Sequence, residues 1–110
     1  MVNPIAIDLI KDSTKIIDLA KALKAEGFSF ARVKSIYSEI CIAVEKYTKT
    51  VGVLSSEAKI EIATDMVNIV VDIPYVPEWL ERKIFRYGIK KAIKYFNDTF
   101  GKDWLNKLTD

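Results

Sequence analysis

The most distinctive chemistry in this sequence is a row of basic residues in its last third. Their spacings of three, four and four residues place them on one side of a helix. The row consists of Lys83, Arg86, Lys90 and Lys94. Two aromatic residues, Trp79 and Tyr87, fall on or beside the same side. Phosphate contact and base stacking need basic residues interleaved with aromatic ones, so this row is a candidate site for nucleic acid or another polyanion.

Two other interpretations of the basic row remain open. It could be a solvated helix face whose long Lys stems cover the edge of the core, or it could meet an acidic protein surface. The chain has 17 basic and 15 acidic residues, and a net charge of +2 gives little general field for nucleic acid. The sequence contains no zinc-finger spacing, no helix-turn-helix glycine signature and no RNA-binding sheet motif.

An acidic row precedes the basic one. It consists of Glu57, Glu61, Asp65 and Asp72. Carboxylate oxygens are the ligands that Ca²⁺ and Mg²⁺ prefer, but the sequence has no EF-hand loop, and the absence of His excludes the Glu-x-x-His element of di-iron sites. We therefore expect no metal here. The more useful interpretation is complementarity, in which the acidic and basic rows pair across a protein interface and set its register.

The remaining residue types argue against an enzyme. There is no His and only one cysteine, Cys41, which excludes an internal disulfide and leaves no residue that would activate the thiol. We expect Cys41 to be a packing residue. Ser55 and Ser56 are suited to helix capping, and the four glycines form no phosphate-binding loop. We therefore predict no catalytic residues, no metal and no cofactor.

The sequence also indicates where the protein is found. No basic segment precedes an apolar run at the start, and no apolar stretch approaches the ~20 residues that a membrane span needs. We expect a cytoplasmic protein with no membrane partner, in keeping with its single cysteine. The lack of Gln, together with 15 Ile and 14 Lys, fits a thermophilic source, although an AT-rich genome would produce a similar bias.

Apolar residues recur at spacings of three and four through most of the chain, which predicts helices. The first opens at Asn3-Pro4 and ends at Gly27, with a possible break at Asp12–Thr14. The others are expected over 30–50, from Ser55 or Ser56 to Asp72, from Pro77 to about Asp98, and, as a short last helix, over 102–108. The run Ile69–Ile73 could form a strand, but no partner segment exists and a lone strand is unstable. The predicted fold is all-α: a compact single-domain bundle over residues 1–110, with four main helices plus a short C-terminal helix.

The segment between the third and fourth predicted helices is a stiff elbow. Pro74 and Pro77 lie three residues apart and restrict the residues before them to extended conformations. Tyr75 and Trp79 stand at or near this elbow. They either seal the end of the core or serve as aromatic anchors for a partner, since Tyr and Trp dominate interface hot spots.

The third predicted helix has an apolar arc of roughly 200°, at about 100° per residue. One packed side cannot bury so wide an arc, so this helix is either central in the bundle or contacts a second chain. We expect a homo-oligomer, most simply a dimer, in which one apolar stripe meets its own copy. The stripe consists of Ile62, Met66, Ile69 and Ile73.

These observations lead to two functional hypotheses. The first is a small cytosolic non-enzymatic helical protein that acts by self-association and protein–protein interaction. The alternative is a small nucleic-acid-binding or polyanion-binding protein that uses the basic face of the fourth predicted helix.

Overall fold

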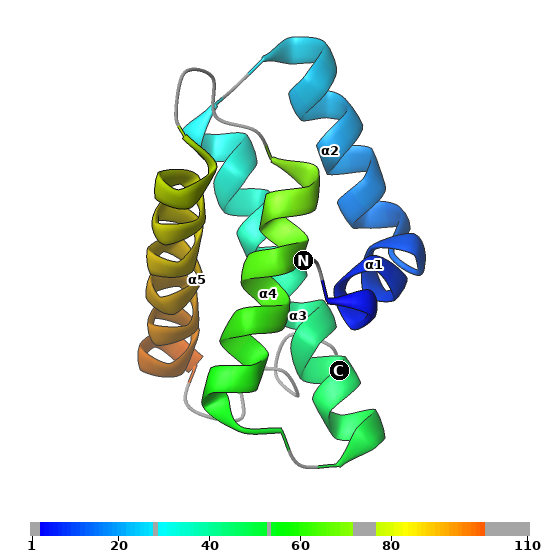
Figure 1. Cartoon of the computed structure of the whole chain (residues 1–110), viewed down its shortest axis with the longest axis vertical. Coiled ribbons are helices and arrows are strands. Elements are labelled where there is room, and N and C mark those ends of the chain that lie inside the picture. Colours follow the sequence, from blue (N-terminus) through cyan, green and yellow to red (C-terminus); the bar gives the residue numbers. More distant parts are fainter. Residues whose placement is uncertain (1–2, 28, 53, 72–76, 101–110) are drawn as a thin grey trace.

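The computed structural model describes residues 3–27, 29–52, 54–71 and 77–100, which form five α-helices and no strand. The helices are α1 (Pro4–Lys11), α2 (Thr14–Glu26), α3 (Phe30–Val51), α4 (Ser56–Val70) and α5 (Glu78–Phe100) (Figure 1). The predicted all-α bundle is therefore confirmed. The short helix expected over 102–108 lies outside the described residues.

Polar caps explain where the helices begin. The side chain of Asn3 accepts a hydrogen bond from a backbone N–H of α1 at 2.9 Å, and Pro4 occupies the first helical position. Ser13 caps a separate α2 by accepting from its first turn at 3.2 Å, so the possible break in the first predicted helix is real. Of the two candidate caps for α4, Ser55 accepts the hydrogen bond and Ser56 is the first helical residue.

The helix ends follow from backbone conformation. Gly27 and Gly52 close α2 and α3 with φ values of 91° and 103°, a region that favours glycine. Helix α4 ends at Val70, two residues before the predicted end at Asp72, because Val71 turns to an extended conformation with φ of −119° and ψ of 133°.

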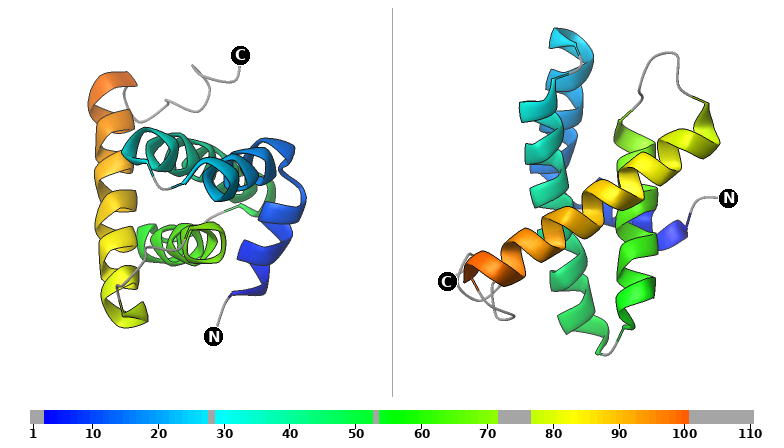
Figure 2. Two further views of the ribbon diagram at one scale, coloured as in Figure 1. Left: turned by 90° about the horizontal axis from the view of Figure 1, so that it is seen from above. Right: turned by 90° about the vertical axis from the view of Figure 1, so that its left-hand side faces the viewer.

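The helices are arranged in three layers. Helices α3 and α4 form the middle layer, α1 and α2 lie on one side of it, and α5 crosses diagonally over the other side (Figure 2). Helix α4 packs against α1, α3 and α5. Its wide apolar arc is therefore accounted for by a central position in the bundle, which is one of the two alternatives that the sequence left open.

The core holds α5 tightly against the middle layer. Phe85 and Ile89 of α5 are 1% and 0% exposed. At Gly88, a Cβ atom would lie 2.6 Å from Cε2 of Tyr37 on α3, so a larger residue here would require the Tyr37 ring to move. One side of α5 is thereby fixed against α3 and α4, and its opposite side is directed away from the bundle.

Candidate functional site

The solvent-facing side of α5 gathers aromatic and apolar side chains of unusual exposure. Trp79, Tyr87 and Tyr95 are 64%, 63% and 54% exposed. Leu80 and Ile84 on the same helix are 37% and 40% exposed. These five are the majority of the nine large hydrophobic side chains that are exposed among the described residues.

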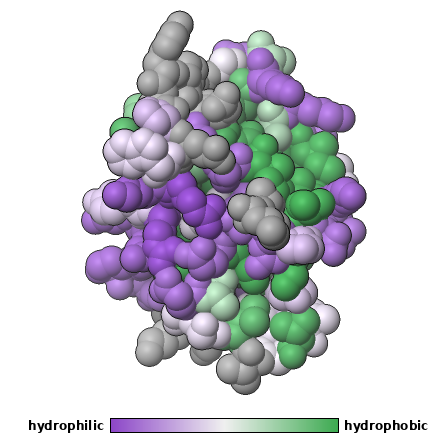
Figure 3. Space-filling view, in the orientation of Figure 1, coloured by the Kyte–Doolittle hydropathy of each residue, from purple (hydrophilic) through white to green (hydrophobic). Residues whose placement is uncertain are grey.

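Four lysines share this side with the aromatic residues. We call the whole set the α5 outer face; it consists of Trp79, Leu80, Lys83, Ile84, Tyr87, Lys90, Lys91, Lys94 and Tyr95, all exposed. Figure 3 shows hydrophilic side chains gathered over α5 and the adjoining side of α4. The other described helices pack on the far side of α5 and leave the α5 outer face uncovered (Figure 2).

The arginines of α5 turn the other way, toward α4. Arg82 pairs with Asp65 at 2.5 Å and with Glu61 at 2.9 Å, and Arg86 pairs with Glu61 and Glu57. We call these five residues the α4–α5 ion-pair cluster. Its hydrogen bonds, first of all from Arg82 to Asp65 and from Arg86 to Glu57, raise the pKa of both arginines.

Asp65 is the buried member of this cluster. Its side chain is 6% exposed, and its second carboxylate oxygen accepts a hydrogen bond from the backbone N–H of Asn3 at 3.0 Å. A single carboxylate thus connects the start of α1, the middle of α4 and the start of α5. Because a buried carboxylate needs such partners, Asp65 is a structural residue.

The structure therefore divides the predicted basic row. Arg86 belongs to the ion-pair cluster, and Lys94 donates to Asp98 of the same helix at 2.9 Å, so neither is a free cation. Within the described part of the chain, Lys83, Lys90 and Lys91 form no ion pair. Lys91, which flanks the row in the sequence, belongs to the same exposed face as Lys83 and Lys90.

The predicted complementarity of the two charged rows occurs within one chain. Glu57, Glu61 and Asp65 meet the arginines of their own α5, so they are not a docking strip for a second chain. Asp72 lies outside the described residues. The sequence indicated the pairing of charges but could not show that both helices would be neighbours in the same bundle.

The predicted self-association stripe requires a correction as well. Ile62 and Met66 are 3% and 0% exposed in the core of their own chain, where α4 packs against α1, α3 and α5. Ile69 is 42% exposed, and Ile73 lies outside the described residues. The contiguous apolar stripe that supported a dimer is thus not on the surface of α4.

Of the two predicted aromatic anchors, Trp79 is exposed at the start of α5, and Tyr75 lies outside the described residues. Two exposed rings of α5 carry lysines four residues further on. The ammonium of Lys83 lies 5.4 Å from the centroid of the Trp79 ring, and that of Lys91 lies 5.4 Å from the Tyr87 ring. Both are cation–π contacts along one helix face.

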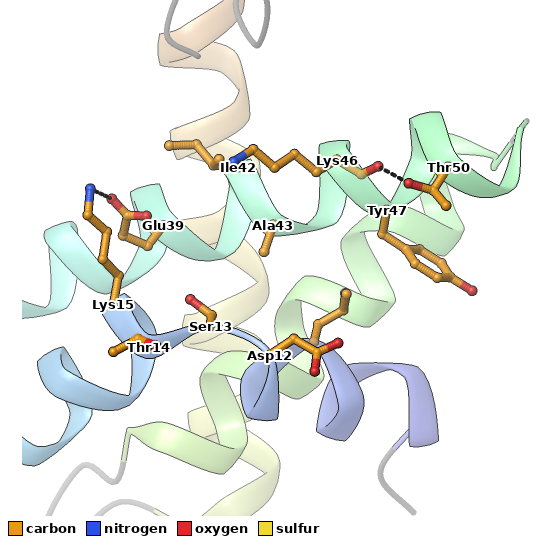
Figure 4. A pocket seen from close by; sticks show the side chains of 11 residues that line it. Asp12, Ser13, Thr14, Lys15, Glu39, Ile42, Ala43, Lys46, Tyr47 and Thr50 are labelled. Atoms are coloured by element: carbon orange, nitrogen blue, oxygen red, sulfur yellow. Dashed lines mark hydrogen bonds and ion pairs between the residues drawn. The ribbon is translucent and has the colours of Figure 1, made fainter.

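A groove elsewhere on the molecule offers less chemistry. It has a volume of about 590 Å³ and lies where the turn between α1 and α2 faces α3 (Figure 4). The hydroxyl of Ser13 in its wall caps α2, and Lys15 pairs with Glu39 at 3.6 Å across it. These polar groups serve the fold, so the groove gives no argument for catalysis.

The cysteine and the carboxylates add no reactive centre among the described residues. Cys41 is 3% exposed, and burial, with a smaller contribution from the charge of Glu45, raises the pKa of its thiol to about 12. A protonated thiol is a poor nucleophile, which confirms the packing role predicted for Cys41. No group of three His, Cys, Asp or Glu side chains in the described ranges could hold a metal ion.

Comparison with protein-family models, with curated proteins and with solved structures finds no match for this chain. Every described helix is too short or too polar to cross a lipid bilayer. The functional inference therefore depends on the geometry of the molecule itself.

Proposed function

We propose that this protein is a non-catalytic binding protein that holds an acidic macromolecule on the α5 outer face. The observation that carries the proposal is the gathering of three exposed aromatic rings and four lysines on one side of one helix. Exposed aromatic side chains are costly in water and are typical of interaction surfaces. The lysines make that surface positively charged, so it favours a negatively charged partner.

The distribution of charge on α5 supports this assignment. The two arginines are neutralised by the carboxylates of α4 and fix α5 to the bundle. Lys83, Lys90 and Lys91, which form no ion pair among the described residues, remain exposed on the α5 outer face. The arginines thus stabilise the fold, and the lysines are available to a partner. Binding to the lysines would not require any ion pair that stabilises the fold to break.

The same charges argue against a symmetric dimer through this face. In a two-fold interface the same patch is present on both subunits, and the lysines of one copy would then face those of the other. Like charges placed opposite one another disfavour such an arrangement. The partner is therefore a different molecule with negative charge.

The proposal can be tested by salt elution from immobilised heparin, a sulfated polysaccharide that serves as a general polyanion. The variant Lys83→Ser/Lys90→Ser/Lys91→Ser removes the unpaired cations of the α5 outer face. The matched control, Lys21→Ser/Lys24→Ser/Lys34→Ser, removes three exposed lysines of α2 and α3 and changes the net charge equally. We expect the first variant to elute at clearly lower salt than the wild type and the control to elute close to the wild type.

Two results would contradict the proposal. One is the absence of wild-type retention at low salt. The other is an equal loss of retention in both variants, which would mean that only total charge matters. Circular dichroism of all three proteins checks that their helical structure is unchanged.

A further inference from the structure

We infer that the acidic partner is a single-stranded nucleic acid whose bases stack on Trp79 and Tyr87 while its phosphates bind the neighbouring lysines. This inference rests on the proposed function and names the class of partner. It uses one feature beyond charge, the pairing of each of these rings with a lysine on the same face.

The feature is a unit of one aromatic residue and one lysine that occurs twice along α5. Trp79 is followed by Lys83, and Tyr87 by Lys91, with the same ring-to-ammonium distance of 5.4 Å in both. Trp79 and Tyr87 are 64% and 63% exposed, so each retains an open surface. Each unit therefore offers a stacking platform and a cation within reach of one nucleotide, the combination that binds single strands.

The spacing of the units favours a strand whose bases are not stacked on one another. Eight helical residues separate Trp79 from Tyr87, which corresponds to about 12 Å along the helix axis and a rotation of roughly 80°. Successive bases in a DNA duplex are only about 3.4 Å apart and hide their faces in the stack. The two rings can be reached together only by unstacked bases on a strand that crosses α5 obliquely.

The state of the arginines argues against recognition of a duplex. Bidentate contact with base edges in the major groove is typically made by free arginine side chains. Arg82 and Arg86 are committed to Asp65, Glu61 and Glu57. The cations that remain on the outer face are lysines, which act as point charges on phosphates. We therefore expect binding with little sequence preference.

The composition of the face argues against an acidic protein as the partner. The centres of protein interfaces are depleted in lysine, whereas Lys83, Lys90 and Lys91 are distributed along the α5 outer face. Leu80 and Ile84, at 37% and 40%, are less exposed than the three aromatic residues of this face, and lysines are interspersed with them. Stacking on aromatic rings between cations is the mode that this distribution supports.

The experiment compares four labelled or immobilised probes: a 12-nucleotide oligo(dT), a 12-base-pair duplex, poly-glutamate and heparin. Fluorescence anisotropy measures binding of the first three to the wild type, to Trp79→Ser/Tyr87→Ser and to the control Phe30→Ser, which removes an aromatic side chain that is 80% exposed on α3. We expect oligo(dT) to bind best. Loss of stacking should weaken oligo(dT) binding by about 5- to 150-fold per ring, from the ~1–3 kcal/mol that stacking contributes per base. Phe30→Ser should bind oligo(dT) like the wild type.

A spectroscopic measurement detects the stacking itself. The chain has two tryptophans, so Trp104→Phe leaves Trp79 as the only one. We expect oligo(dT) to quench the fluorescence of Trp79 and heparin to leave it unchanged. The lysine variant of the preceding section should reduce the slope of log affinity against log salt by about 0.7 for each phosphate that no longer binds a lysine.

Each failure points to a different conclusion. Oligo(dT) binding that is unchanged in Trp79→Ser/Tyr87→Ser, or a duplex that binds as tightly as the single strand, would overturn the stacking inference and leave the proposed function standing. Poly-glutamate binding without oligo(dT) binding would overturn it too and would replace nucleic acid with an acidic protein. The absence of binding to all four probes would overturn the proposed function as well.

Discussion

Cys41 shows how burial converts a reactive group into a packing group. It lies on the buried side of α3, and burial raises the pKa of its thiol from 9.0 to about 12. Tyr37, one turn earlier on the same helix, is partly buried against α5, and burial raises the pKa of its phenol from 10.0 to about 12. Both groups therefore hold their protons more tightly in the folded protein than in the unfolded chain.

This difference predicts a loss of stability in alkali. Well below about pH 9 both groups are protonated in either state, so they contribute no pH dependence. Between about pH 9 and about pH 12 the unfolded chain releases protons that the folded protein keeps, and the free energy of unfolding falls as the pH rises. Each group contributes a slope of at most about 1.4 kcal/mol per pH unit. Urea unfolding at several pH values between about 8 and 11 measures this slope.

The contribution of Cys41 can be isolated with Cys41→Ala. This variant loses packing at every pH, but it should lose less additional stability than the wild type as the pH rises. An identical pH slope in the two proteins would contradict the assignment of the shifted pKa to Cys41.

Arg86 and Lys90 show the limit of a helical wheel at the residue scale. They are four residues apart and differ by roughly 40° around the helix axis, so the sequence placed them in one basic row. In the structure Arg86 reaches Glu61 and Glu57, while Lys90 is exposed. The difference depends on which side of α5 meets α4, and that is set by tertiary packing, which periodicity alone does not contain.

At the scale of the elements, the α4–α5 ion-pair cluster combines buried and exposed charges. The side chain of Asp65 is 6% exposed and that of Glu57 is 66% exposed. An exposed ion pair contributes little because water and salt screen it. A buried carboxylate with satisfied hydrogen bonds leaves its donors without partners when it is removed. The two ends of the cluster should therefore differ strongly in their effect on stability.

We predict that Asp65→Ala lowers the free energy of unfolding by about 1–3 kcal/mol, because the N–H of Asn3 loses its acceptor and the guanidinium of Arg82 keeps only Glu61. The matched variant Glu57→Ala, which also removes a carboxylate bound to an arginine of α5, should cost less than about 0.5 kcal/mol. Urea unfolding of both variants measures the difference. An equal loss of unfolding free energy in the two variants would mean that burial does not determine how much each carboxylate of this cluster contributes to stability.

The helices themselves were largely predictable because their signals are local. Asn3, Ser13 and Ser55 begin helices through hydrogen bonds to the next turn, and Gly27 and Gly52 end them through a backbone conformation that other residues avoid. The angle at which two helices cross, in contrast, is set by contacts between residues that are distant in the sequence. The diagonal path of α5 brings Gly88 close to Tyr37 of α3, a contact between residues far apart in the sequence that local signals do not contain.

At the scale of the whole molecule, the three-layer arrangement explains the wide apolar arc of α4. A helix at the centre of a bundle is covered on several sides by its own chain, whereas a peripheral helix needs only one apolar side. Sequence periodicity gives the width of the apolar arc but does not show whether the same chain or a second chain packs on it. It could therefore not distinguish a central helix from an interface helix. Met66 and Ile69, three residues apart on α4, now mark the covered and the open part of that arc.

These two residues allow the last prediction, which concerns self-association through α4. Met66 is fully buried, so Met66→Lys places a charge in the core and should unfold the protein or destabilise it by several kcal/mol. Ile69 is 42% exposed, so Ile69→Lys should leave the free energy of unfolding within about 0.5 kcal/mol of the wild type. Because the rest of the predicted stripe that the structure describes is buried, Ile69→Lys should also leave the mass in solution unchanged at tens of micromolar. Size-exclusion chromatography with light scattering measures that mass, and a dimeric wild type that becomes a folded monomer in Ile69→Lys would restore α4 as an interface and contradict the prediction.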